Sequence, residues 1–156
     1  MTVDMTWRSV PQTAKQPDLE MVSGAMPADA PAIRTIAMPA DTNPAGDVFG
    51  GWLMCQMDLA GGNAATRCAR GRCVTVAANS ISFQSPVKVG DEVSVWAQLI
   101  GIGRTSMKFR VSAWCRAADG GRTTKVTEAE FTYVALDSDG RPRPIEASAL
   151  SDMAGR

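Results

Sequence analysis

A pair of glycines, Gly50 and Gly51, opens the longest helical pattern in the chain. Apolar residues then recur at spacings of three and four, the repeat of a buried helix face: Trp52, Leu53, Met54, Met57, Ala60, Ala64 and Ala65. This predicts a helix of about 20 residues, about 30 Å long, ending near Arg67 and Arg70, whose charges suit its negative end. The helix is apolar on nearly all sides, so we expect it to be buried beneath a sheet, with the small residues 60–62 facing close backbone.

Alternation of apolar and polar residues, the repeat of a β-strand, replaces the helical pattern after Arg70. It predicts four strands joined by short turns, over residues 72–86, 93–102, 106–116 and 123–136. A shorter strand at 33–38, ended by Pro39, precedes the helix. One strand, one long helix and four more strands predict an α+β fold, in which a long antiparallel sheet wraps around one central hydrophobic helix.

Two of these strands alternate so regularly that their faces can be assigned. The core faces are predicted to carry Met107, Phe109, Val111, Ala113 and Cys115 in one strand, and Ala129, Phe131, Tyr133 and Ala135 in the other. The opposite faces are polar and charged, and we expect them to be wetter.

The two ends of the chain lack a clear period. Residues 1–30 mix prolines with polar and small residues, which predicts a flexible arm whose Trp7 is a candidate anchor on a partner subunit. Residues 31–144 are predicted to form one domain, and residues 145–156 a C-terminal tail. A chain of 156 residues with 45% hydrophobic content is long and apolar enough for a single core.

Charge and hydropathy exclude several classes of partner. Lysine and arginine total 16, equal to the 16 aspartates and glutamates, so the net charge is zero. Binding to nucleic acid or to an anionic membrane favours a basic excess, and we expect neither partner. No apolar run reaches the roughly 18 residues of a membrane span, and no signal-peptide pattern opens the chain, so a cytoplasmic location is expected.

The absence of histidine narrows the chemistry most. Without histidine, Ser-His-Asp and Cys-His catalysis, zincin motifs and most transition-metal sites are excluded, and no metal site is expected. The four cysteines, at positions 55, 68, 73 and 115, show no C-x-x-C spacing, so we interpret them as reduced core thiols. A general base in this chain must therefore be a carboxylate or, as weaker candidates, a lysine or a cysteine.

Asp58 is the candidate carboxylate. It is the only charged side chain between Asp47 and Arg67, and helical spacing puts it on one face with the apolar residue Met54. Its structural interpretation is a partly exposed helix residue that caps a neighbouring loop; its functional one is a catalytic group. Asp47 itself is predicted to cap the helix start and shape the loop before it, which leaves that end rich in N–H donors.

Several motifs in this order resemble bacterial acyl-CoA thioester hydrolases of the YciA type, which have the hotdog fold. The matching segments are Ala-Met-Pro-Ala-Asp-Thr-Asn at 37–43, Gly-Asp-x-Phe-Gly-Gly-Trp at 46–52, Gln-Met-Asp at 56–58, Phe-x-x-Pro-x-x-Val-Gly-Asp at 83–91, Gly-Arg-Thr-Ser at 103–106 and Phe-x-x-Val-Ala-Leu-Asp at 131–137. The resemblance spans residues 33–144 and leaves the arm and the last residues unexplained. It implies hydrolysis of acyl-CoA to a free acid and CoA.

The resemblance also implies roles for three residues. The backbone amide of Gly50 polarises the thioester carbonyl, and Asp58 activates water as a general base or attacks the carbonyl itself. Asn43 holds the thioester or the water, and the alternative for this residue is an Asx turn before Pro44. Many hotdog relatives hold a water with a polar residue early in the second strand, a position occupied here by Val76, with Thr75 or Asn79 as substitutes.

Coenzyme A carries phosphates, so a neutral protein needs a local cationic site. Arg104, with Thr105 and Ser106 in the same hairpin turn, is the leading candidate, and Lys88 is a weaker one. No cofactor is implied beyond CoA as part of the substrate. The hotdog sheet implies pairing with a second copy, hence a homodimer at least, with a hexamer of three dimers as the larger assembly.

Two alternatives remain at this stage. One is another hotdog enzyme, an acyl-thioester hydratase, but that family uses an Asp/His pair and this chain has no histidine. The other is a non-catalytic acyl-CoA binding or sensor module, which would keep the pocket without needing Asp58. The preferred acyl chain length does not follow from the sequence.

Overall fold

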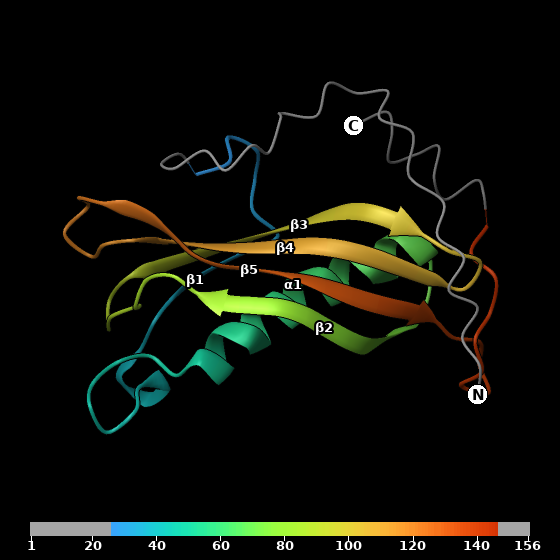
Figure 1. Cartoon of the computed structure of the whole chain (residues 1–156), viewed down its shortest axis with the longest axis horizontal. Coiled ribbons are helices and arrows are strands. Elements are labelled where there is room, and N and C mark those ends of the chain that lie inside the picture. Colours follow the sequence, from blue (N-terminus) through green and yellow to red (C-terminus); the bar gives the residue numbers. More distant parts are fainter. Residues whose placement is uncertain (1–25, 147–156) are drawn as a thin grey trace.

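The computed structural model of the chain describes residues 26–146, which form one sheet and one long helix (Figure 1). The elements in order are β1 (Ile33–Ile36), a 3-10 turn (Pro39–Asp41), α1 (Gly50–Ala69), β2 (Cys73–Phe83), β3 (Glu92–Ile102), β4 (Ser106–Arg116) and β5 (Thr123–Ala135). The strands lie in the order β1-β3-β4-β5-β2, and the pairs they form are antiparallel. The predicted α+β order and the 20-residue helix are confirmed.

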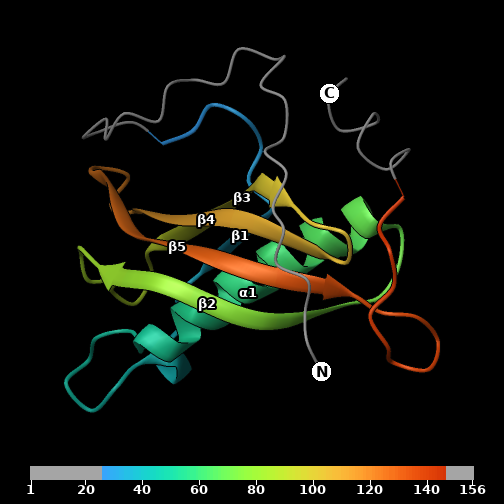
Figure 2. The same cartoon turned by 45° about the vertical axis from the view of Figure 1, so that its right-hand side comes forward.

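Helix α1 packs along one face of the sheet, as the two views agree (Figures 1 and 2). The core lies between them and contains the predicted inner faces of β4 and β5. Its helix side is formed by Leu53, Met57, Ala60, Gly61, Ala64, Ala65, Cys68 and Ala69. Burial of these residues provides the main stabilisation of the domain, because removal of apolar area from water contributes about 25 cal/mol per Å².

The small residues of α1 face a side chain, not backbone as predicted. A Cβ atom on Gly61 would lie 2.2 Å from the hydroxyl oxygen of Tyr133, and one on Gly62 would lie 3.7 Å from its ring. Real carbon atoms do not approach so closely, so glycine at position 61 is what lets the β5 tyrosine reach the helix. The depth at which α1 lies under the sheet is therefore matched to one aromatic ring.

One side of α1 remains exposed in the single chain, although the pattern predicted burial on nearly all sides. Met54 and Leu59 are 38% and 55% exposed, and Val74 and Val76 of the neighbouring edge strand β2 are 42% and 50% exposed. Cys55 also lies on this side, so it is not the core thiol that was predicted. Large apolar side chains exposed on a helix and on the unpaired edge strand beside it are typical of an interface with another chain.

The described residues extend the domain at both predicted boundaries. At the N-terminal side, the indole nitrogen of Trp96 donates to the carbonyl of Asp29 over 3.0 Å. At the C-terminal side, Ile145 packs against the core and its amide donates to the carbonyl of Arg104 over 2.9 Å. The rest of the predicted arm, with Trp7, and the rest of the tail lie outside the described residues.

Arg143 closes the C-terminal end of α1. Its Nη2 donates to the carbonyl of Ala69 over 2.6 Å, and its Nε donates to the carbonyl of Leu136 over 3.1 Å. A Cβ atom on Gly71 would lie 2.6 Å from the same Nη2. A guanidinium thus satisfies a helix-end carbonyl and places positive charge at the negative end of the helix.

We expect Arg143→Ala to lower the free energy of unfolding by about 2 kcal/mol, because it removes charged hydrogen bonds to three carbonyls, those of Ala69, Leu136 and Pro144. Arg141→Ala is the matched control, since that side chain is 76% exposed and pairs only at the surface with Asp139. It should change stability by less than about 0.5 kcal/mol. Urea unfolding at one fixed protein concentration measures both variants, and equal losses would contradict the role of Arg143.

Candidate active site

The helix start presents two backbone amides. Phe49 is the N-cap residue and no side chain caps the helix, so the predicted capping role of Asp47 is wrong. Within residues 26–146, no group accepts a hydrogen bond from the amides of Gly50 and Gly51, whereas Trp52 N donates to the carbonyl of Phe49. Free N–H groups at the positive end of a helix are the kind of donor that favours negative charge.

An apolar groove lies beside these amides. It has a volume of about 460 Å³, counting the part open to solvent, and its lining includes Val48, Phe49, Leu53, Phe83, Val87 and Val126. The ring of Phe83 covers Gly50 so closely that a Cβ atom there would lie 3.1 Å from it. The groove suits an uncharged, apolar part of a ligand whose polar atom reaches the helix start.

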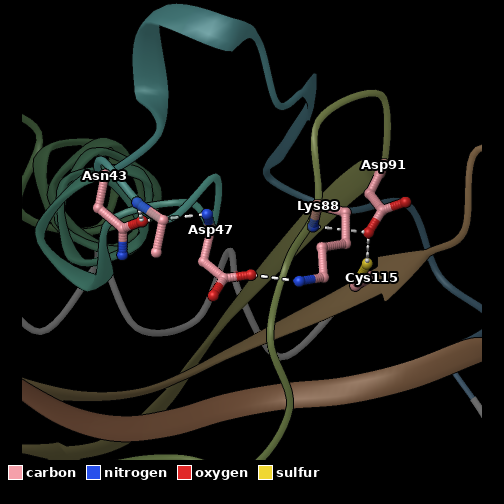
Figure 3. A network of polar contacts seen from close by, with 6 residues as sticks. Asn43, Asp47, Lys88, Asp91 and Cys115 are labelled. Atoms are coloured by element: carbon pink, nitrogen blue, oxygen red, sulfur yellow. Dashed lines mark hydrogen bonds and ion pairs between the residues drawn. The ribbon is translucent and has the colours of Figure 1, made fainter.

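Asn43 forms the Asx turn that was the alternative to its predicted role in binding the thioester or water. Its side-chain Oδ1 accepts from the backbone amides of Ala45 and Asp47 over 2.9 and 3.1 Å (Figure 3). Its backbone amide donates to the backbone carbonyl of Asp47. The Oδ1 atom is therefore committed to the loop. Only the Nδ2 group is left for a substrate, so any contact that Asn43 makes is as a hydrogen-bond donor.

Asp47 turns away from the helix and pairs with Lys88 (Figure 3). Lys88 lies in the turn before β3, and the buried carboxylate of Asp91 holds this turn. That carboxylate accepts from the backbone amides of Lys88 and Ala118 over 2.9 and 3.1 Å. Cys115 donates to Asp91 over 3.3 Å; burial, then the hydrogen bond and the charge of Asp91, raise its pKa to about 12. This network fixes the loop before α1 against the turn before β3 and the end of β4.

Asp58 lies eight residues after Gly50, hence about 12 Å along the helix axis. Its Oδ1 accepts hydrogen bonds from Thr75 over 2.6 Å and from Tyr133 over 3.3 Å. Tyr133 was not predicted as a site residue. The available signal was that the only tyrosine of the chain falls on a predicted core face, where a hydroxyl needs a partner.

Three of the four cysteines, Cys68, Cys73 and Cys115, do not compete with Asp58 as bases. Burial raises the pKa of Cys68, with the neighbouring Cys73 adding to the effect. Burial also raises the pKa of Cys73, against the opposing charge of Arg143. With Cys115 shifted the same way, these three thiols stay protonated near neutral pH. Among the described residues, no group of three or more potential ligands is placed to hold a metal ion.

The four predicted CoA-binding residues do not come together in one chain. Arg104 and Thr105 lie in the β3–β4 turn, Ser106 is fully buried, and Lys88 precedes the opposite end of β3. A strand of 11 residues separates the two ends by roughly 35 Å. The buried Ser106 hydroxyl is out of reach of a ligand on the surface of this chain.

Comparison with known proteins places this chain in a family. The model of the thioesterase superfamily matches residues 45–132. The chain belongs to the thioesterase superfamily. An acyl-CoA thioester hydrolase, YciA of Salmonella typhimurium, is 47% identical over 116 residues, which cover 72% of this chain and 87% of the relative.

Two solved structures support the same membership of the thioesterase superfamily. One is a hexameric broad-specificity acyl-coenzyme A thioesterase, 42% identical with a TM-score of 0.76, covering 84% of this chain and 92% of that one. The other is a hexameric hotdog-fold thioesterase of Campylobacter jejuni, 36% identical with a TM-score of 0.74, covering 82% and 98%. The predicted hotdog fold and YciA-type resemblance are confirmed. Within residues 26–146, no helix is both long and apolar enough to cross a bilayer.

The contact between Gly50 and Phe83 generates a stability prediction. Gly50→Ala should lower the free energy of unfolding by about 1 kcal/mol, because the added methyl group forces the ring aside. Gly51→Ala is the control: a Cβ atom there meets nothing within 4 Å. It should stabilise the helix by about 0.5 kcal/mol. In the double variant, Phe83→Leu should remove most of the loss caused by Gly50→Ala. Equal effects of Gly50→Ala and Gly51→Ala in chemical denaturation would contradict the Gly50–Phe83 contact.

Proposed function

We propose that this protein hydrolyses acyl-CoA thioesters to a free acid and CoA, with Asp58 of one chain acting on a carbonyl polarised by the Gly50 amide of its partner. Family membership supports the reaction, since its relatives are named acyl-CoA thioester hydrolases. The observation that carries the residue roles is a lone helical carboxylate held by two hydroxyls, on the same helix as two free amides.

The chemistry needs a place for negative charge and a group that activates the attacking oxygen. As the carbonyl carbon becomes tetrahedral, its oxygen gains charge that the Gly50 amide and the helix dipole stabilise. Asp58 takes a proton from water as that water attacks; the C–S bond then breaks and CoA leaves as a thiolate, which gains a proton. In the second route the Asp58 carboxylate attacks the carbonyl carbon, the C–S bond breaks and CoA leaves as a thiolate; water then hydrolyses the resulting anhydride to the free acid and Asp58. Asn43 contributes the Nδ2 donor to the thioester or the water.

The helix itself argues for a site built from two chains. Reacting atoms must come within about 3–3.5 Å, but Asp58 and Gly50 of one chain are about 12 Å apart along the helix. Two antiparallel helices related by a two-fold axis bring Asp58 beside the partner's Gly50 when the axis crosses at Met54, midway between them. Met54 lies on the exposed apolar side of α1. A homodimer is therefore the smallest active unit, and three such dimers would make the hexamer of the named structural relatives.

The same dimer reconciles the separated CoA-binding residues. The β3–β4 turn lies at the C-terminal end of α1, because Ala135 N donates to the carbonyl of Thr105 and Arg143 N donates to that of Ala135. Arg104 is thus about 18 Å along the helix axis from Asp58 of its own chain, a span comparable to the extended pantetheine arm of CoA. In an antiparallel pair this end of one chain faces the helix start of the other, where Lys88 lies.

Asp58→Asn tests the proposed function. We expect kcat to fall by about a thousandfold with the fold and CoA binding retained, because a base or nucleophile acts in the transition state. Asp139→Asn, at an exposed turn, is the control and should keep wild-type kcat. Free acid should be measured by chromatography, because a thiol reagent used to detect CoA also reacts with any accessible cysteine of the protein. Near wild-type kcat in Asp58→Asn would reject the mechanism, and inactivity of the wild-type protein on a panel of acyl-CoAs would favour a binding module.

Arg104→Ala tests the phosphate contact. We expect it to raise KM about tenfold for acyl-CoA, but not for an acyl-pantetheine without the nucleotide, because a remote phosphate contact contributes uniform binding. Arg122→Ala, in the exposed β4–β5 turn, is the control and should change neither value. Equal effects of Arg104→Ala on both substrates would place the phosphate site elsewhere.

A further inference from the structure

The two carboxylate oxygens of Asp58 have different surroundings. Oδ1 accepts from the Thr75 hydroxyl over 2.6 Å and from the Tyr133 hydroxyl over 3.3 Å. Oδ2 accepts a hydrogen bond from no residue in the part of the chain that the structure describes. One oxygen is thus held by the protein, and the other is open to a ligand.

The sheet register brings the two hydroxyls to one point. Thr75 of β2 is the cross-strand partner of Tyr133 of β5, so both side chains project toward α1. The register shifts directly after Thr75, where the next pairing joins Ala77 to Thr132 and leaves Val76 unpaired in a bulge. A bulge re-aims a strand, and here it leaves Val76 half-exposed at the sheet edge while Thr75 meets the carboxylate.

Tyr133 is held rigidly. Its ring is 1% exposed, packs edge-on against Phe109 with centroids 5.9 Å apart, and stacks beside Phe131 at 6.2 Å. Its hydroxyl lies in the space that Gly61 leaves free and donates to the backbone carbonyl of Asp58 over 3.3 Å as well as to Oδ1, so its one proton is shared between two acceptors of the same residue. A ring fixed on three sides gives its hydroxyl a defined position, which a site requires of a supporting group.

The Tyr133 hydroxyl can act only as a donor to this carboxylate. Burial raises the pKa of Tyr133 well above its ordinary value, and the charge of Asp58 and the hydrogen bond to it add to the effect. The phenol therefore keeps its proton across the physiological pH range. A carboxylate accepts hydrogen bonds and has none to give, so the direction of the contact is fixed.

We propose that Tyr133 is a positioning residue, which together with Thr75 holds Asp58 through Oδ1 and assigns Oδ2 as the oxygen that acts on water or on the thioester carbon. The inference rests on the proposed function of Asp58 and deepens it. One requirement accounts for a glycine, a tyrosine and a threonine beside a bulge, on three different elements. That requirement is a single orientation of one carboxylate.

Tyr133→Phe is the first test, because it keeps the ring and its fit against Gly61 and removes only the hydroxyl. We expect kcat for acyl-CoA to fall about tenfold, with KM within about twofold and Tm within about 3 °C of wild type. The matched control is Val111→Ala, a buried β4 residue outside the site. It should lower Tm by more than Tyr133→Phe while the folded protein keeps its kcat. A purely structural tyrosine would give the same pattern as Val111→Ala.

Thr75 supplies an independent pair of variants. Thr75→Ser keeps a hydroxyl and should keep kcat within about twofold, whereas Thr75→Val keeps the shape and should lower kcat about tenfold. The proposal is overturned if either Tyr133→Phe or Thr75→Val retains wild-type kcat, or changes only KM, while Asp58→Asn is inactive. That outcome leaves the proposed function standing. An active Asp58→Asn would instead overturn the proposed function and this inference together.

Discussion

A stiff helix separates the two chemical groups of the candidate site by about 12 Å, and the rest of the molecule is arranged around that separation. The Gly50 amide and the Asp58 carboxylate cannot meet at one carbonyl within a chain. The helix they share rules out a site within one chain but favours two equivalent sites in a dimer. A two-fold axis between antiparallel helices places the Asp58 carboxylate of each chain beside the Gly50 amide of the other. The exposed apolar side of α1 and the open edge of β2 are what such pairing would cover.

Each end of this separation is fixed by a different part of the sheet. At the helix start, the loop from Asn43 to Phe49 is tied by the Asp47–Lys88 pair to a turn that the buried Asp91 holds. At Asp58, the hydroxyls of Thr75 on β2 and Tyr133 on β5 orient the carboxylate by hydrogen bonds. Both supports come from residues far along the chain, so the positions of the Gly50 amide and the Asp58 carboxylate depend on the completed sheet and not on the helix alone.

Long periodic patterns made most of the fold predictable. The helix limits, the strand spans and the isolated carboxylate at Asp58 all follow from spacing, because burial on one face imposes a repeat of 3.6 or 2. The Asx turn at Asn43 is equally local, since its hydrogen bonds span only a few residues.

The features that the sequence did not predict depend on long-range contacts or on a second chain. Asp47 was assigned to the helix start because of its position, but its partner Lys88 is 41 residues away. The fit of Tyr133 against Gly61 and the bulge at Val76 depend on strand register, which alternation alone leaves open. The apolar side of α1 looked like core because a pattern does not reveal whether the same chain or a partner covers it.

Complementation between two inactive variants measures the shared site most directly. Asn43→Asp keeps the turn-forming oxygen of Asn43 but removes its Nδ2 donor, and Asp58→Ala removes the carboxylate. When the two variants are unfolded together and refolded in equal amounts, random pairing should make about half of the dimers mixed. Each mixed dimer has one intact site out of two, so activity should return to about a quarter of wild type. A mixture that stays as inactive as its parents, although native mass spectrometry detects mixed dimers, would contradict the two-chain site.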